Sequence, residues 1–375
     1  MKILYILSSF NTGGVESVVR DLMNNMVETN PGLELFLIIL SNNKLELLDQ
    51  LNKRIKVHVL PTANSSRGMT NFWNNLRQYR NLRNLIREIS PDVIHTHILL
   101  YSSIPVYMAM WGMGKTVRHF HTIHTIGLHY ASKSLPSRLK CFIERFIYRH
   151  FKTRIICISP VINDVAKLRL GVDKSRIFNI SNGIDLRKYF NQESSGHNNG
   201  DALKLVYLAR LDKGKNHLTL LEAMRKIISY YPHTELHLLG DGPEMNTIKN
   251  YIEECGLAQN VVLYGNVQDV VPVLKKCDIG VFPSEFEGCS IAILEMMASG
   301  LPIVCSSIPA FTSIFGKDEV LFFDCKNSSQ LSDQIIRLIS DESLIKNYSE
   351  KAMNIANRFS LDSLVSKHIK AYTHG

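Results

Sequence analysis

The sequence lacks the features that mark several special classes of protein. No apolar run approaches the ~18 residues that a membrane-spanning helix needs. The apolar run at the start, from Lys2 to Ser8, is too short for a signal peptide, so we expect a cytoplasmic protein. There is no low-complexity tract, and 45% apolar with 21% charged residues is typical of a globular chain.

Cysteine is sparse, and its spacing is not that of a bridged or metal-binding protein. The seven cysteines lie far apart and include no Cys-x-x-Cys pair, which favours buried apolar thiols. The first half is instead crowded with histidines: His95, His97, His119, His121, His124 and His129. No acid or cysteine accompanies them at ligand spacing, so we predict no metal site.

Lysine and arginine are distributed unequally along the chain. The net charge is +9, but residues 1–175 hold 23 Lys and Arg against 11 Asp and Glu, whereas residues 176–375 hold 20 against 23. The first half therefore points to an anionic partner, either lipid headgroups, a nucleic acid or a phosphorylated substrate. A nucleic acid is disfavoured because no aromatic-rich binding motif or helix-turn-helix pattern accompanies the charge.

Short apolar runs alternate with helical patterns in both halves, which predicts an α/β fold. The length of 375 residues suits two large domains. We expect two doubly wound, Rossmann-like parallel sheets. The predicted strands are 2–7, 34–40, 56–60, 93–95, 116–121 and 154–158, then 204–209, 235–239, 261–264, 279–282, 303–305 and 321–323. The polar segment 191–201 reads as a linker.

Two sheets of this kind leave a cleft, and ligands bind beyond the carboxyl ends of the strands. After the first strand, Gly13 and Gly14 open a helical pattern, where they form either a tight turn or a close approach to a phosphate. Arg210 and Lys215 follow the strand at 204–209. An arginine fork with a lysine charge suits a diphosphate, although a plain surface charge cluster would look the same.

The most distinctive pattern is the stretch EGCSIAILE, which runs from Glu287 to Glu295. We expect a helix from about Ser290, with Glu287 in the loop before it and Glu295 among apolar residues of its first two turns. An acid in so apolar a stretch needs a partner, and a pair of ribose hydroxyls would supply one. The N–H groups of Cys289, Ser290 and Ile291 could hold phosphate oxygens.

The order of these residues resembles the family-4 retaining glycosyltransferases of the GT-B fold. The resemblance runs from about Ile3 to Phe359 and is dense from Lys204 to Cys305. It rests on Gly13-Gly14, Arg210 with Lys215, Gly240-Asp241-Gly242-Pro243-Glu244, Tyr264-Gly265-Asn266-Val267, and Pro283-Ser284 leading to Glu287 and Glu295. At Cys289-Ser290 many members have Phe-Gly instead.

The resemblance implies a role for each matching position. Arg210 and Lys215 would bind the donor diphosphate, Glu295 the ribose, and Glu287 hydroxyls of the transferred sugar. Further implied contacts are Gly13 and Gly14 with the diphosphate, the backbone of Val267 with the base, the run Gly288, Cys289, Ser290 and Ile291 with the donor, and His121 with the transferred sugar. The family looks metal-independent, so no cofactor beyond the donor is expected.

The predicted domains are residues 1–180, on the acceptor side, and 181–358, which would bind the donor. A last helix over 359–375 is expected to cross back onto the first domain. Two basic amphipathic stretches, 71–89 and 138–154, lie in the first half. They either pack on the first sheet with solvated basic faces, or dock on an anionic membrane where a lipid-linked acceptor would be reached.

We therefore predict a retaining, hexosyltransferase-type enzyme. It would transfer a sugar from a nucleotide-diphosphate sugar, with a UDP-sugar favoured, to a glycan or lipid-linked acceptor of bacterial surface polysaccharide. The predicted catalytic residues are His121, Arg210, Lys215 and Glu287. Retention without a protein nucleophile implies a front-face substitution, in which the departing phosphate takes the acceptor's proton. The alternatives are a nucleotide-sugar epimerase on the same fold and a non-catalytic, membrane-associated partner protein.

Overall fold

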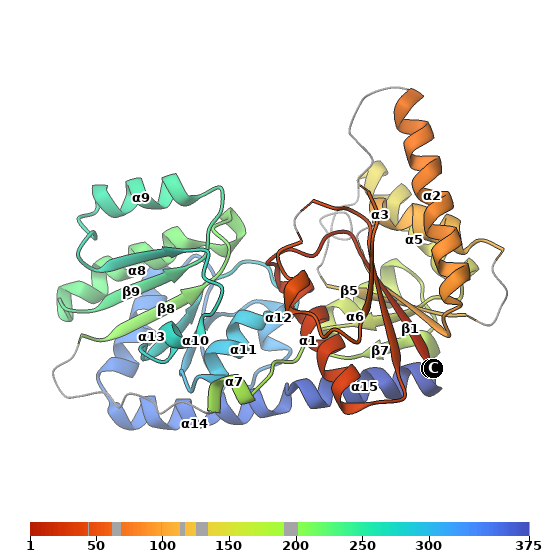
Figure 1. Ribbon diagram of the computed structural model, residues 1–375. Coiled ribbons are helices and arrows are strands. Elements are labelled where there is room, and N and C mark those ends of the chain that lie inside the picture. Colours follow the sequence, from red (N-terminus) through yellow and green to blue (C-terminus); the bar gives the residue numbers. More distant parts are fainter. Residues whose placement is uncertain are drawn as a thin grey trace. The chain divides into compact units, whose positions relative to one another are not determined.

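The structure, a computed structural model, describes residues 1–43, 45–61, 69–98, 100–112, 117–124, 134–190 and 202–374. The predicted linker at 191–201 and His129 lie outside these ranges. The chain divides into two compact units. Unit 1 is Met1–Asn182 together with Leu361–Gly375, and unit 2 is Gly183–Ser360. Figure 1 shows a twisted sheet with flanking helices in each unit.

Unit 1 is built on a seven-stranded, fully parallel sheet in the order β3-β2-β1-β4-β5-β6-β7. Its strands are β1 (Lys2–Leu7), β2 (Glu34–Ile39), β3 (Lys56–Val59), β4 (Val93–His97), β5 (Arg118–Ile123), β6 (Arg154–Cys157) and β7 (Ile177–Asn179). Its helices are α1 (Gly14–Thr29), α2 (Met69–Ile89), α3 (Leu100–Met110), α5 (Leu135–His150), α6 (Pro160–Asp164) and α15 (Leu361–His374), with the short turns η1 (Leu48–Gln50), η2 (Val165–Arg169) and η3 (Lys174–Arg176).

Unit 2 repeats this architecture with a six-stranded parallel sheet in the order β10-β9-β8-β11-β12-β13. Its strands are β8 (Lys204–Leu208), β9 (Glu235–Leu239), β10 (Val261–Gly265), β11 (Ile279–Phe282), β12 (Ile303–Ser306) and β13 (Leu321–Phe323). Its helices are α7 (Arg187–Phe190), α8 (His217–Tyr230), α9 (Met245–Glu254), α10 (Val271–Leu274), α11 (Ile291–Ala298), α12 (Pro309–Thr312), α13 (Ser328–Ile339) and α14 (Glu342–Arg358), with the turn η4 (Lys213–Lys215).

The predicted strands are confirmed to within two residues at their ends. The strand β7 was not predicted; it is only three residues long, half-buried to exposed, and at the edge of its sheet. The buried strands were recognisable because helices cover both of their faces, which demands nearly continuous apolar runs. In unit 1, Leu82 and Ile86 of α2 and Val106 of α3 pack against one such run, which contains Leu4 and Ile6.

The prediction for the second basic stretch was wrong at its end. The helix α5 stops at His150, and Arg154 begins the strand β6.

No helix in the described part of the chain combines the length and the apolar character needed to cross a membrane.

The last helix, α15, belongs to unit 1. The hydroxyls of Tyr372 in α15 and Tyr5 in β1 lie 3.0 Å apart, and Asn25 of α1 donates to Asp362 at 3.1 Å. Arg118 at the start of β5 donates to the Tyr372 carbonyl. The chain therefore leaves unit 1 after Asn182 and returns to it at Leu361.

Candidate active site

The strand order of unit 2 brings its predicted site residues to the carboxyl edge of the sheet. Successive strands are added on one side of β8 up to β10 and on its other side from β11 onward, so β8 has β9 and β11 as its neighbours. The loops that leave β8 and β11 diverge at such a switch point, where doubly wound sheets bind their ligands. Arg210 and Lys215 follow β8, and Glu287 follows β11. The predicted residues thus come from the two strands that flank the switch point.

Backbone hydrogen bonds tie the loops of this edge together. The N–H of Leu211 donates to Asp241 at 3.1 Å, and the N–H of Gly240 donates to Gly265 at 2.7 Å. On the other side of β8, the N–H of Glu285 donates to Gly214 at 2.9 Å. The loops after β10, β9, β8 and β11 therefore form one continuous surface.

Glycines in the predicted Gly-Asp-Gly-Pro-Glu segment allow this close approach. Gly240 has a φ of +141°, and a Cβ at this position would overlap the carbonyl oxygen of Ala209. A Cβ on Gly242 would lie 2.5 Å from the carbonyl oxygen of Leu211. The backbone of this loop is thus packed directly on the loop that carries Arg210.

Lys215 and Glu287 form an ion pair, with 2.5 Å between Nζ and Oε1. Their side chains are 25% and 9% exposed, so Glu287 is largely covered. Tyr207 holds the local backbone, because its hydroxyl donates to the Lys215 carbonyl at 2.9 Å and lies 2.9 Å from Ser284 Oγ. Burial, and next the negative charge of Glu287, raise the pKa of Tyr207 well above its usual value, so this hydroxyl stays protonated.

Arg210 is placed differently from Lys215. Its side chain is 69% exposed, and its Nε lies 3.4 Å from Asp212 Oδ2. A single exposed pair of this kind contributes little to stability, so the guanidinium can be recruited by a ligand at small cost.

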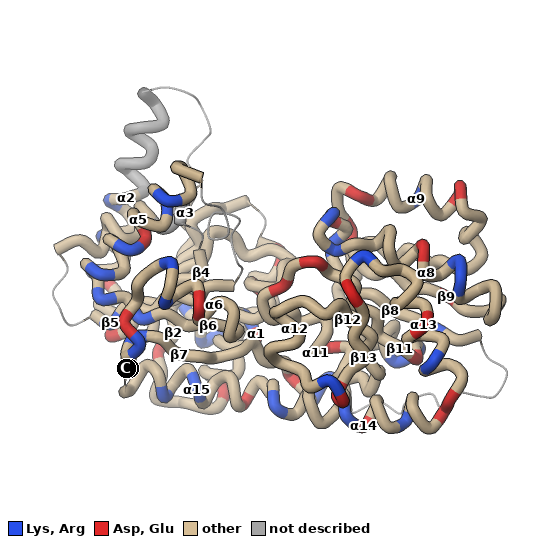
Figure 2. The backbone as a smooth tube through the Cα atoms, turned by 180° about the vertical axis from the view of Figure 1, so that it is seen from behind, with Lys and Arg blue, Asp and Glu red and all other residues tan. Residues whose placement is uncertain are grey.

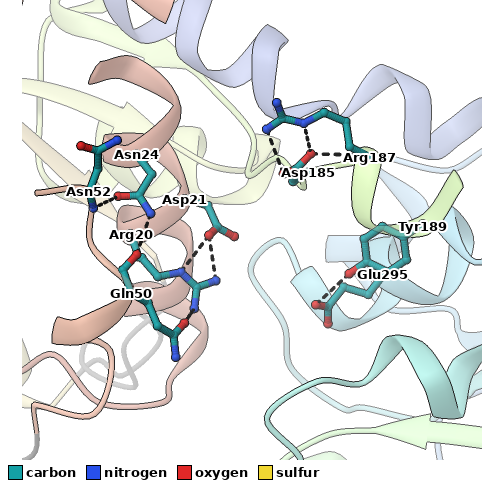
Figure 3. Close-up of polar contacts among 9 residues, drawn as sticks. All are labelled: Arg20, Asp21, Asn24, Gln50, Asn52, Asp185, Arg187, Tyr189 and Glu295. Carbon is teal, nitrogen blue, oxygen red and sulfur yellow. Dashed lines mark hydrogen bonds and ion pairs between the residues drawn. The ribbon is translucent and has the colours of Figure 1, made fainter. Parts of the chain in front are cut away.

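Glu295 lies on α11, as predicted, among the buried residues Ile293, Leu294, Met296 and Met297. Its Oε1 accepts a hydrogen bond from the Tyr189 hydroxyl at 3.1 Å (Figure 3). Tyr189 belongs to α7 and is not among the predicted site residues. It supplies a polar partner within the chain for an acid that we expected to need one.

The helix α11 begins next to this pair. Ser290 is its N-cap residue but forms no side-chain capping hydrogen bond, and Gly288 and Cys289 before it are buried. The first N–H groups of an α-helix have no partner within the helix and favour negative charge. Val267, two residues beyond β10, is half-buried. For these positions a contact with the donor remains a prediction.

Of the predicted site residues of unit 1, Gly13 and Gly14 follow β1, at the switch point between β1 and β4, whereas His121 lies in the neighbouring strand β5. Gly13 is the N-cap of α1, and Gly14 is exposed with open space around it. The side chain of Glu16 reaches back past Gly13 to accept from Ser9 Oγ at 3.1 Å. His97 ends β4 on the other side of the switch point. The roles of Gly13 and Gly14 toward a diphosphate stay predictions.

The histidines of β4 and β5 are buried, and they bond to hydroxyls or to another histidine. His121 is 6% exposed, and its Nδ1 lies 2.9 Å from Thr96 Oγ1. Burial lowers the pKa of His121 to about 4, so the ring is neutral at pH 7. Nδ1 of His97 and Nε2 of His124 are 2.8 Å apart. Within the described ranges, no three His, Cys, Asp or Glu side chains are arranged to hold a metal ion.

Two family models match the chain, one to each half. Residues 12–188 match the model described as Glycosyltransferase Family 4, and residues 190–355 match the model described as Glycosyl transferases group 1. The chain belongs to the family-4 glycosyltransferases. Its two units are those of the GT-B fold, as the sequence predicted.

Several curated relatives match more than four fifths of this glycosyltransferase. A UDP-Gal:α-D-GlcNAc-diphosphoundecaprenol α-1,3-galactosyltransferase of Escherichia coli is 25% identical over 86% of the chain and 84% of its own length. The capsular polysaccharide biosynthesis glycosyltransferase CapH of Staphylococcus aureus is 24% identical over 82% of both chains. Among solved structures, Anabaena HepE in complex with UDP and glucose superposes with a TM-score of 0.82 at 18% identity over the full length of both chains.

Proposed function

We propose that this glycosyltransferase transfers a hexose from a UDP-sugar to a lipid-linked or glycan acceptor in the assembly of a bacterial surface polysaccharide. The observation that carries the proposal is the Lys215–Glu287 ion pair at the β8–β11 switch point, with Glu295 on the following helix. This arrangement offers a cation for a diphosphate and two carboxylates for hydroxyl groups. The names of the relatives support the donor and acceptor classes, since one uses UDP-Gal and a diphosphoundecaprenol-linked sugar.

In the proposed complex, Glu295 accepts hydrogen bonds from the ribose hydroxyls while keeping its bond to Tyr189. Lys215 and Arg210 bind the diphosphate, Glu287 binds the transferred sugar, and the first N–H groups of α11 meet phosphate oxygens. An ammonium has three donors, and Glu287 occupies one of them in the structure. Lys215 can therefore contact a phosphate without first breaking its ion pair.

We propose a front-face substitution with retention of the anomeric configuration. The bond between the anomeric carbon and the phosphate oxygen breaks as the acceptor oxygen bonds to the same face of that carbon. The acceptor's proton passes to the leaving phosphate oxygen. Arg210 and Lys215 stabilise the charge that develops on the diphosphate. His121 takes part only as a neutral hydrogen-bonding group, since its pKa lies near 4.

The donor site is tested by thermal unfolding with UDP, GDP and their sugars, on wild type and on Glu295→Ala. A ligand that binds only the folded state stabilises it by about 2.7 kcal/mol at a hundredfold excess over Kd. We expect a uridine ligand to stabilise the wild type and not Glu295→Ala. Tyr189→Phe is the matched control, because it removes the hydrogen bond to Glu295 but keeps the carboxylate, and should retain most of the stabilisation.

The reaction itself is tested with the stabilising UDP-sugar and a panel of diphosphoprenol-linked sugars. An α-linked product from an α-linked donor supports retention, and a β-linked product overturns the front-face mechanism. Conversion of the donor's sugar without any acceptor would indicate an epimerase instead. If no nucleotide stabilises any variant, the non-catalytic partner becomes the better explanation.

A further inference from the structure

The helix α5 of unit 1 has its polar and apolar faces reversed. Its buried residues are Ser137, Glu144 and Tyr148, of which two are polar. Its exposed residues include four large apolar side chains, here called the α5 stripe: Leu135, Leu139, Phe142 and Phe146, with 79%, 58%, 66% and 56% exposed. A helix of a soluble protein normally turns such residues toward the core.

The α5 stripe is continuous and faces away from the core. Its members are spaced by four, three and four residues, which places them on one side of a helix with 3.6 residues per turn. The buried residues are spaced by seven and four residues, which places them on the opposite side. Large apolar side chains that gather in one exposed patch mark an interaction surface, whereas scattered ones do not.

Cations line one edge of the α5 stripe. Arg138, Arg145 and Arg149 lie three residues after Leu135, Phe142 and Phe146 respectively, and all three are exposed. The one acid of α5, Glu144, is buried. Figure 2 shows lysine and arginine gathered on α5 and its neighbours. The exposed side of this helix therefore carries apolar and cationic groups and no carboxylate.

A shallow cavity of about 400 Å³ adjoins this cationic edge. Arg145, Arg149 and Arg176 line it, and Asp173 is the one acid among its described lining residues. The size and charge of the cavity suit a phosphate-bearing headgroup.

Trp111 extends the apolar surface beyond α5. It follows α3, is 51% exposed, and stacks on His150 at the end of α5, with 4.2 Å between ring centroids. Tryptophan favours the boundary between water and the acyl region of a bilayer.

We propose that α5 is a membrane-docking element that lies flat on an anionic lipid surface. The α5 stripe enters the acyl boundary, and Arg138, Arg145 and Arg149 contact headgroup phosphates. The charge pattern favours this occupant. A nucleic acid would leave the four apolar side chains in water, and a neutral protein surface would leave the arginines without partners. The proposal deepens the proposed function, because it brings a lipid-linked acceptor to the enzyme.

The other basic stretch does not share this property. In the described part of α2, Leu82, Ile86 and Ile89 are buried, and Arg83 donates to the carbonyls of Ala109 and Trp111. This part of α2 packs on the sheet with a solvated basic face, one of the two alternatives left open by the sequence. Of the two basic stretches, as far as the structure describes them, α5 is the one that turns large apolar residues outward.

The test is co-sedimentation of the full chain with phosphatidylcholine vesicles that contain either none or 30% phosphatidylglycerol. We expect binding to the anionic vesicles at low salt and little binding to the neutral ones. Phe142→Ser with Phe146→Ser should weaken binding more than tenfold. Arg145→Gln with Arg149→Gln should also weaken vesicle binding more than tenfold, since each cation contributes roughly fivefold. The same double variant should reduce the salt dependence of binding.

Matched control variants lie in unit 2. Tyr230→Ser removes one aromatic residue that is 66% exposed, and Lys249→Gln with Lys276→Gln removes two exposed cations; neither should change vesicle binding.

The proposal is overturned if the wild type does not bind anionic vesicles, or if the α5 variants bind them as tightly as the wild type. So does a dimer in light scattering that Phe142→Ser with Phe146→Ser dissociates, because a second copy would then cover the α5 stripe. Stabilisation by UDP, measured on the same proteins without vesicles, separates failure of docking from failure of the donor site.

Discussion

At the scale of single residues, the Lys215–Glu287 ion pair sets the electrostatic potential that the proposed donor site presents to a diphosphate. The sequence placed both residues at the same edge of a sheet, but it did not show that they bind each other, because 72 positions separate them. Only the parallel pairing of β8 with β11 brings them together. Glu287 therefore reduces the positive potential that Lys215 presents to a diphosphate.

This geometry predicts opposite effects of Glu287→Gln on binding and on transfer. The variant keeps the shape of the side chain but removes a negative charge 2.5 Å from the ammonium. We expect UDP to bind about fivefold more tightly, which corresponds to ~1 kcal/mol. Sugar transfer should fall at least a hundredfold, because an amide is a weaker acceptor than a carboxylate for hydroxyls of the transferred sugar.

Isothermal titration with UDP and initial rates with the UDP-sugar measure the two effects separately. Lys215→Met is the companion variant, and it should weaken UDP binding. Weaker UDP binding by Glu287→Gln would show that the carboxylate organises the diphosphate site rather than opposing it.

At the scale of elements, the loop after β9 depends on glycine for its path. Gly240→Ala should destabilise unit 2 by about 2 kcal/mol or more, because φ at this position is +141° and the new Cβ would overlap the Ala209 carbonyl. Gly214→Ala is the control in the same unit, since its Cβ would meet nothing closer than 3.9 Å. Urea unfolding of both variants provides the measurement, and equal losses would contradict the explanation.

Sequence patterns predict a buried element more readily than they predict what covers it. The buried strands were found because their apolar runs are continuous, while β7 escaped notice because it is short and lies at the sheet edge. The α5 stripe repeats every three to four residues, which is the spacing of a core-facing helix. Periodicity indicates that one side of a helix is apolar but not what covers that side. The exposure of Phe142 and Phe146 could be learned only from the structure.

At the scale of the whole molecule, the two ends of the chain complete one core. His368 and Tyr372 of α15 join the buried histidines of unit 1, and the Tyr372 hydroxyl lies 2.5 Å from Nδ1 of His95. No local pattern near residue 372 reveals a partner 277 positions earlier. The return of α15 thus makes unit 1 a discontinuous folding unit with a buried polar centre.

This centre predicts that unit 1 is sensitive to acid. Burial lowers the pKa of His368 and His121 to about 4 and that of His124 to about 3, and it holds those of His95, His97 and His119 well below 6.5. Below pH 6.5 the unfolded chain therefore binds more protons than the folded unit. The stabilisation is fully present above about pH 6.5 and is lost as the pH falls toward 4, by about 1.4 kcal/mol per pH unit for each such histidine.

We expect unit 1 to unfold before unit 2 as the pH is lowered from 7.5 to 4.5, because unit 2 contains fewer buried histidines with a lowered pKa in its described residues. Hydrogen exchange at several pH values would locate the loss in β4, β5 and α15. His368→Leu fills the buried position with an apolar side chain and removes one titrating ring. The stability of this variant should therefore fall less steeply below pH 6.5 than that of the wild type. A pH dependence identical to that of the wild type would mean that folding does not lower the pKa of His368, contrary to its burial against His95.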